Sequence, residues 1–247
     1  MPRSAYRPTL LLLLTLLPAA CATPPHELPI EERPLVGPAD YVFVFLMKGD
    51  YVPESEDEGR ELMRGHFDNM TRLAEAGRLL LAGPFGPGSP DPNLRGIFVF
   101  DTPDVEEAKE LVTSDPAIAA GVFRAAPLRW AGPAALRRVP GLDDRALAEL
   151  PPEQRVPGAT GRPFVLATCT NHAEANRVAP ALRDDLAFGG PIVGAKDMVW
   201  IGAIDAETPE QARDALAAVD ADLDSWALLP WFSSRVILDI DLPAGAP

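Results

Sequence analysis

Residues 98–111 (FVFDTPDVEEAKEL) and residues 202–215 (GAIDAETPEQARDA) follow one pattern. In each, an apolar run of strand length ends in aspartate, a short turn follows, and an amphipathic helix comes next. The matching positions lie 104 residues apart, at Asp101 and Asp205 and at Ala108 and Ala212. This agreement exceeds what two unrelated helices would give, so the sequence is interpreted as an internal duplication.

A second pair of motifs supports the repeat. Gly83-Pro84 recurs as Gly190-Pro191, a shift of 107 residues, and a hairpin loop three residues shorter in the second half accounts for the difference. Around these motifs each half has the order strand, helix, strand, strand, helix, strand, which is the ferredoxin-like plan. The expected strands lie at residues 41–47, 78–85, 96–101, 125–130, 163–169, 186–192, 198–205 and 231–239, and the expected helices at 59–77, 104–114, 171–185 and 208–220.

Each ferredoxin-like unit leaves one face of its sheet bare, and that face must be covered. The predicted fold class is therefore α+β, with two ferredoxin-like domains packed as an intramolecular pseudo-dimer around a sheet-lined cavity. The expected domains are residues 40–130 and 162–241. A Pro-, Gly- and Ala-rich linker with at most one short helix, DDRALAEL, joins them over residues 131–161.

The first forty residues predict export. A basic start and the apolar run TLLLLLTLLPAA (residues 9–20) are typical of a signal peptide, here residues 1–20, and the run is too short to span a bilayer. LPAAC is typical of a lipobox, which makes Cys21 a lipid-attachment residue, whereas Ala20-Cys21-Ala22 also suits ordinary signal peptidase. Residues 21–39 are Pro-rich and predict an extended tether. We expect a membrane-anchored lipoprotein facing the periplasm or cell exterior, with a soluble periplasmic or secreted protein as the alternative.

Charge and composition exclude several classes. A formal charge of −14 disfavours nucleic-acid partners. Three scattered histidines predict no metal site, and the chain has no Gly-x-Ser-x-Gly elbow. Cys169, in an apolar strand, is expected to be an inert buried thiol.

One histidine stands out in the stretch LMRGHFDNMTRLAEAGRLLLAGPF (residues 62–85). His66 lies on the predicted apolar stripe of the helix, whose members are Leu62, Met63, His66, Phe67, Met70, Leu73 and Ala74, while Asp68 and Asn69 are expected to be solvated. A buried imidazole needs a hydrogen-bond partner, and Asp115 would orient it as a general base requires. Asp115 is equally suited to cap a helix that starts with Pro116.

The first half resembles the YciI-like (YCII-related) family of the dimeric α/β-barrel superfamily. The matching features are His66 on a helix, Ala82-Gly83-Pro84 ending a strand, Asp115-Pro116, and the segment AAGV at residues 119–122. The resemblance covers about residues 40–130 and is weak over 162–238, so the second copy is expected to be degenerate. Counting from Gly190, the position that matches His66 is Ala173, with His172 one residue away.

The resemblance implies a dimeric α/β-barrel fold and an acid-base pair, His66 and Asp115, with Gly83, Pro84 and Phe85 binding a small-molecule ligand. Activity would be of an isomerase, lyase or dehydrochlorinase type on a small cyclic or aromatic compound, without cofactor. The alternative is a non-catalytic module of the cell envelope that binds small molecules or partners. A monomer acting as its own pseudo-dimer is expected.

Overall fold

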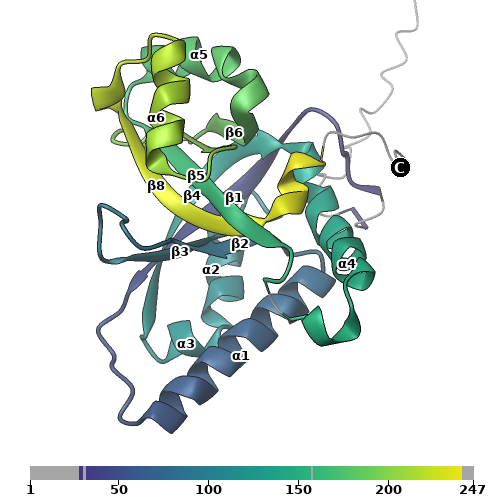
Figure 1. Ribbon diagram of the computed structural model, residues 1–247. Helices are drawn as coiled ribbons and strands as arrows, with labels where there is room; N and C mark the ends of the chain where they lie inside the picture. The colour runs from purple at the N-terminus through teal and green to yellow at the C-terminus, as the bar shows by residue number, and fades with distance from the viewer. Residues whose placement is uncertain (1–27, 30–31, 157, 241–247) are drawn as a thin grey trace, which may run out of the picture.

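The computed structural model describes residues 28–29, 32–156 and 158–240 and has two halves with the same order of elements (Figure 1). The predicted signal peptide, Cys21 and His26 lie outside these residues. The elements of the first half are β1 (Pro38–Lys48), α1 (Glu56–Glu75), β2 (Leu79–Pro84), β3 (Leu94–Phe100), α2 (Val105–Thr113), α3 (Pro116–Ala119) and β4 (Phe123–Pro133). Those of the second are β5 (Gly161–Cys169), α5 (His172–Ala181), η5 (Arg183–Asp185), β6 (Leu186–Pro191), β7 (Trp200–Ile204), α6 (Pro209–Ala218), η6 (Leu223–Ser225), β8 (Trp226–Ser234) and η7 (Arg235–Leu238).

Each half forms one four-stranded antiparallel sheet. The strand orders are β2-β3-β1-β4 and β6-β7-β5-β8, so corresponding strands occupy corresponding places. The helices α1 and α2 cover one sheet, and α5 and α6 cover the other, on opposite sides of the molecule (Figure 1). The predicted α+β class with two ferredoxin-like units is confirmed. One expected strand was misplaced: β8 begins at Trp226 and ends at Ser234, where a 3₁₀ turn replaces the predicted continuation.

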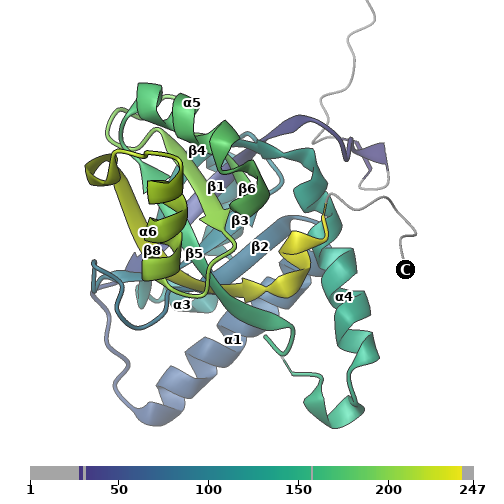
Figure 2. The same ribbon diagram turned by 45° about the horizontal axis from the view of Figure 1, so that its top comes forward.

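The two sheets pack face to face and close into a barrel (Figure 2). At one seam Phe85 pairs with Trp231, and the backbone N–H of Gly86 donates to the carbonyl of Pro230 at 2.8 Å. At the other seam Trp130 pairs with Ile192. The chain therefore joins its own sheet edges in the way that two subunits of a dimeric barrel would.

The space between the sheets is filled by side chains. The alternating residues Tyr41, Phe43 and Phe45 of β1 face inward, while Val42 and Val44 face the helices. Aromatic rings meet across the two halves: Trp130 lies edge-on to Phe188 of the second half at a centroid distance of 5.8 Å, and Phe188 is in turn edge-on to Trp231 of its own half at 6.0 Å. Because the inward-facing side chains of both sheets form one buried cluster, the expected sheet-lined cavity is instead a hydrophobic core at this contact.

The segment after the first domain is more ordered than its Pro- and Gly-rich composition suggests. It forms η3 (Ala134–Arg138), α4 (Val139–Glu149) and a short turn η4 (Pro152–Gln154). Pro140 falls in the first turn of α4, where its missing N–H costs nothing, so the helix starts four residues before DDRALAEL. Leu136 and Val139 are buried against the barrel core, which fixes this segment on its surface.

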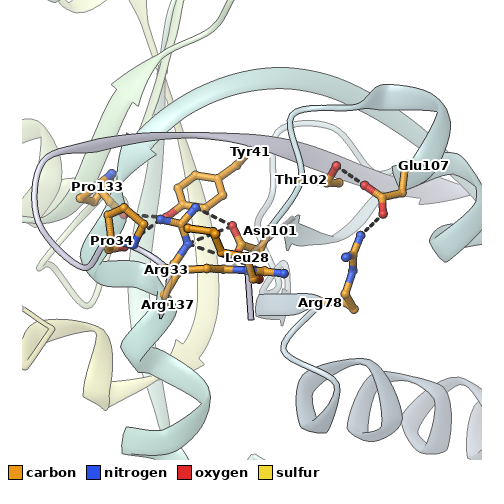
Figure 3. A network of polar contacts seen from close by, with 10 residues as sticks. All are labelled: Leu28, Arg33, Pro34, Tyr41, Arg78, Asp101, Thr102, Glu107, Pro133 and Arg137. Atoms are coloured by element: carbon orange, nitrogen blue, oxygen red, sulfur yellow. Dashed lines mark hydrogen bonds and ion pairs between the residues drawn. The ribbon is translucent and has the colours of Figure 1, made fainter. Parts of the chain in front are cut away.

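A buried ion-pair network attaches the described end of the N-terminal segment to the barrel (Figure 3). Asp101, 1% exposed, accepts from Arg33 at 2.6 Å and from Arg137 at 2.8 Å. Arg137 also donates to the carbonyl of Pro34 and stands over the ring of Tyr41, whose pKa is raised well above its usual range by burial. From Arg33 onward the predicted tether is thus held against the first domain.

Candidate functional site

His66 lies on the buried face of α1. The helix begins at an N-cap, Ser55, whose hydroxyl accepts from the backbone N–H of Glu58, and its buried residues are His66, Asn69 and Leu73. This spacing of three and four places one narrow stripe against the sheet. Phe67 is 46% exposed and Asn69 is 8% exposed, so the predictions that Phe67 is buried and Asn69 solvated are wrong.

Asp115 meets His66 across 49 positions of sequence. Its Oδ1 caps α3 by accepting from the backbone N–H groups of Ala117 at 2.9 Å and Ile118 at 3.4 Å. Its Oδ2 lies 2.6 Å from Nδ1 of His66. The carboxylate is fully buried, so both expected roles hold at once: one oxygen caps the helix and the other holds the imidazole.

Gly65 permits this contact. A Cβ at Gly65 would lie 2.9 Å from Cγ of Pro116, so any side chain there would push α1 and α3 apart. Gly65 was not among the residues predicted for the site, although a glycine inside a strong helical pattern indicates a close approach, since it otherwise lowers helix stability.

Aromatic rings surround the imidazole. Phe98 stacks with it at a centroid distance of 5.9 Å, and Phe67 and Phe123 approach edge-on at 5.4 Å each. No described residue bonds to Nε2, yet this atom is not among the enclosed side-chain atoms that lack a partner. Because His66 is 7% exposed, we infer that its accessible edge carries Nε2.

This geometry defines the chemistry of the pair. An ionised carboxylate only accepts hydrogen bonds, so Nδ1 of a neutral His66 carries the proton and Nε2 keeps its lone pair. The buried Asp115 also stabilises the imidazolium that forms when Nε2 takes up a proton. The arrangement suits a general base whose ring is held in one orientation.

Gly83, Pro84 and Phe85 lie elsewhere. A Cβ at Gly83 would meet the carbonyl oxygen of Phe232 at 2.1 Å and the indole of Trp231 at 2.7 Å. Gly83 and Phe85 lie at the seam between the halves, on the sheet face opposite α1, where Phe85 stacks on Phe45 at a centroid distance of 6.2 Å, and Pro84 between them is exposed. The structure therefore does not bring them together with His66 and Asp115.

An arginine of the first helix makes equivalent contacts in the two halves. In the first half Arg72 donates to Asn69 at 2.7 Å and to Ser114 at 3.1 Å. In the second half an arginine likewise donates hydrogen bonds to the side chain three residues earlier and to the loop after the second helix. Its contacts are Arg177 to Glu174 at 3.0 Å, to the carbonyl of Val219 at 3.1 Å and to that of Asp220 at 2.8 Å.

When the two halves are aligned on these arginine contacts, Arg72 matches Arg177, which is a shift of 105 residues. The position that matches His66 is then Asn171, the exposed N-cap of α5, and not Ala173. The expected alignment was off by two because the 3₁₀ turn η5 lies between α5 and β6. His172 is exposed at the start of α5, and Asp220 is also exposed.

Other candidates are far less suited to chemistry. Cys169 is buried, and burial raises the pKa of its thiol. Among the described residues no group of three or more His, Cys, Asp or Glu side chains could hold a metal ion, and no helix is long and apolar enough to cross a bilayer. A shallow surface hollow on the outer side of α1 includes Phe67, Arg64 and Asp68 but not His66.

Fold and site together define the class: a barrel of two ferredoxin-like units in one chain, with a His–Asp pair under the helices of the first. Residues 43–130 match the family model of the YCII-related domain, the family that the motifs of this stretch resemble. The chain is similar in fold to a mutant chlorite dismutase from Candidatus Nitrospira defluvii, with 11% identity, 85% of this chain and 97% of that chain covered, and a TM-score of 0.49. It is also similar to the siroheme decarboxylase NirDL, with 12% identity, coverage of 81% and 72%, and a TM-score of 0.42. No curated protein matches the sequence significantly.

Proposed function

We propose that the protein is an exported acid-base enzyme that acts on a small cyclic or aromatic compound through His66 and Asp115, without a cofactor. The observation that carries the proposal is the 2.6 Å contact between Nδ1 of His66 and the buried carboxylate of Asp115. The YCII-related domain over residues 43–130 supports a small-molecule role for this half of the chain.

In this reaction Nε2 of His66 removes a proton from carbon, and Asp115 stabilises the resulting imidazolium. For an isomerisation the same imidazolium returns the proton to a neighbouring atom. For an elimination the C–H electron pair forms the new double bond while the leaving group departs with the electrons of its own bond. A positioned base of this kind contributes roughly 10²–10⁴-fold in rate.

Turnover of a panel of unsaturated lactones and chlorinated aromatic diols tests the proposal. His66→Gln should reduce any observed turnover by about 10²-fold or more, whereas His172→Gln, which changes an exposed histidine of the second half, should leave it unchanged. Turnover that survives His66→Gln would rule out the assigned base.

The alternative is a non-catalytic module of the cell envelope that binds a small molecule or a partner. The filled barrel core and the 7% exposure of His66 favour it, because both limit the room for a substrate. Ligand-induced thermal stabilisation that is equal in wild type and His66→Gln, with no turnover of any compound, would support this alternative.

Export through a lipid anchor at Cys21 is supported by the apolar run and lipobox-like residues that precede it. Mass spectrometry of the mature N-terminus tests this part: a diacylated or triacylated Cys21 is expected. An unmodified chain that starts at Thr23 would instead indicate a soluble periplasmic or secreted protein. Native mass spectrometry of the mature protein should show a monomer, since both sheet edges are joined within the chain.

A further inference from the structure

Lys48 is the last residue of β1, which pairs with β4 in the first sheet. It lies directly opposite Phe123 in the antiparallel pairing of β1 with β4. The backbone N–H of the next residue, Gly49, donates to the carbonyl of Val122, while that of Lys48 turns away to Asn93. Lys48 and Phe123 are therefore a non-hydrogen-bonded pair, the kind in which two side chains of one sheet face come closest.

The face that they share is the one that α1 covers. Val42, Val44 and Leu46 of β1 pack under the helices, and the alternation of a strand places Lys48 on the same side. The ring of Phe123 touches that of His66, at 5.4 Å between centroids. The aliphatic stem of Lys48 thus starts next to a ring that borders the base.

Lys48 is also free to bind. Its side chain is exposed, and no ion pair or hydrogen bond to its ammonium joins it to another described residue. The neighbouring cations do not compete for this place. Arg124 is adjacent to Phe123 in β4 and points to the opposite sheet face, and Arg64 lies about 200° around the helix from His66.

We propose that Lys48 binds the carboxylate of the substrate, which makes the substrate a small aromatic or cyclic acid. The inference rests on the proposed function, since it assigns a substrate class to the same site. The acid's ring would lie along Phe67 and Phe123, its carboxylate would meet the Lys48 ammonium, and its reacting atom would face Nε2. Because this contact exists before and during the reaction, losing it should raise KM more than it lowers kcat.

Binding of benzoate, with benzamide as the neutral isostere, tests the proposal at low ionic strength. Imidazole resonances of ¹⁵N-histidine-labelled protein report on the site, and the signal missing in His66→Gln identifies His66. Benzoate should shift the His66 signal saturably in wild type. Lys48→Met should need about tenfold more benzoate, and Lys48→Arg should stay within about threefold of wild type. Arg124→Met is the matched control: it removes the same charge one position from Phe123 and should bind as wild type does.

Three results would overturn the proposal: equal benzoate binding by wild type and Lys48→Met, an equal loss in Arg124→Met, or no saturable shift in wild type. Benzamide should bind weakly and alike in wild type and Lys48→Met, and tight benzamide binding would also contradict a carboxylate site. None of these results removes the role of His66 as base, which turnover of His66→Gln decides independently.

Discussion

Gly65 and Pro116 are in such close contact that a single added methyl group at Gly65 would lie 2.9 Å from Cγ of Pro116. This close approach places Asp115, the N-cap of α3, next to the ring of His66, which follows Gly65 in α1. A glycine of α1 that has no such neighbour provides a comparison: a Cβ at Gly59 would lie 3.7 Å from Pro53, an ordinary contact.

Gly65→Ala should therefore destabilise the protein, whereas Gly59→Ala should stabilise it by about 0.5–1 kcal/mol, the usual gain for alanine over glycine inside a helix. Urea unfolding of the two variants measures the difference. In Gly65→Ala the Nδ1 proton signal of His66 should also lose its downfield shift as the bond to Asp115 lengthens. If both variants gain stability equally, Gly65 has no role in positioning the pair.

Asp115→Asn should invert the tautomer of His66. The amide oxygen of asparagine can still cap α3, but its NH₂ group would donate to Nδ1, which moves the imidazole proton to Nε2 and removes the lone pair of the base. Nitrogen-15 NMR of the ring distinguishes the two tautomers. Asp220→Asn, at the exposed position of the second half that matches Asp115, is the control and should leave His66 unchanged. A His66 that remains protonated at Nδ1 in Asp115→Asn would show that Asp115 does not set the tautomer.

The sequence predicted the fold because strand and helix periods are local patterns, and these periods indicated the two sheets. An Asp-Pro cap and a histidine on a helix were also visible locally, but their pairing across 49 positions was implied by the resemblance to the YciI-like family. The sequence did not show that Phe67 is exposed and Asn69 is buried, because an apolar stripe three to four residues wide does not show which of its edges meets the sheet. It also could not show that aromatic side chains fill the barrel, since this depends on how rings from both halves interlock.

Trp130 and Trp231, which lie at the two seams between the halves, should contribute differently to the free energy of unfolding. Both are buried, but Nε1 of Trp130 donates to the carbonyl of Gly190 at 3.0 Å, while Nε1 of Trp231 is enclosed without a partner among the described residues. Trp130→Phe removes the indole N–H that donates to the buried carbonyl of Gly190. Trp231→Phe removes an indole N–H that has no acceptor among the described residues. Trp130→Phe should cost about 1–3 kcal/mol more than Trp231→Phe in urea unfolding. Equal costs would mean that the indole hydrogen bond adds nothing at this seam.

The buried carboxylate of Asp101 should contribute far more to the free energy of unfolding than that of its counterpart, Asp205. Asp101 holds Arg33 and Arg137, whose side chains are 6% and 4% exposed, while Asp205 pairs with Arg162 at side-chain exposures of 38% and 29%. Asp101→Asn removes the buried carboxylate that both arginines contact and should cost about 3–5 kcal/mol. Asp205→Asn should stay within about 1 kcal/mol of wild type. The free energy of unfolding in urea compares them, and similar losses would show that the attachment of the N-terminal segment adds little.

In each half the first helix contacts the loop that follows the second helix. Lowering the pH should weaken this contact in the second half of the chain before it weakens the matching contact in the first half. The carboxylate of Glu174 accepts from the backbone N–H of Asp222 at 2.7 Å, and this bond, assisted by Arg177, lowers the pKa of Glu174 from its ordinary value of 4.5. A lowered folded-state pKa gives a stabilising contribution that is complete above the unfolded-state pKa and is lost as pH falls through the folded-state pKa. Asn69, which occupies the matching place in the first half, does not titrate.

Amide hydrogen exchange measured from neutral pH down through the acid range tests this difference between the halves, with exchange corrected for its intrinsic pH dependence. The Asp222 amide should lose protection as pH falls below the ordinary glutamate value, while the amides around Ser114 keep theirs. Glu174→Gln should weaken protection of Asp222 at neutral pH and remove most of its acid dependence, because glutamine carries no titrating group. If Glu174→Gln loses protection in acid as steeply as wild type, the sensitivity arises at another carboxylate.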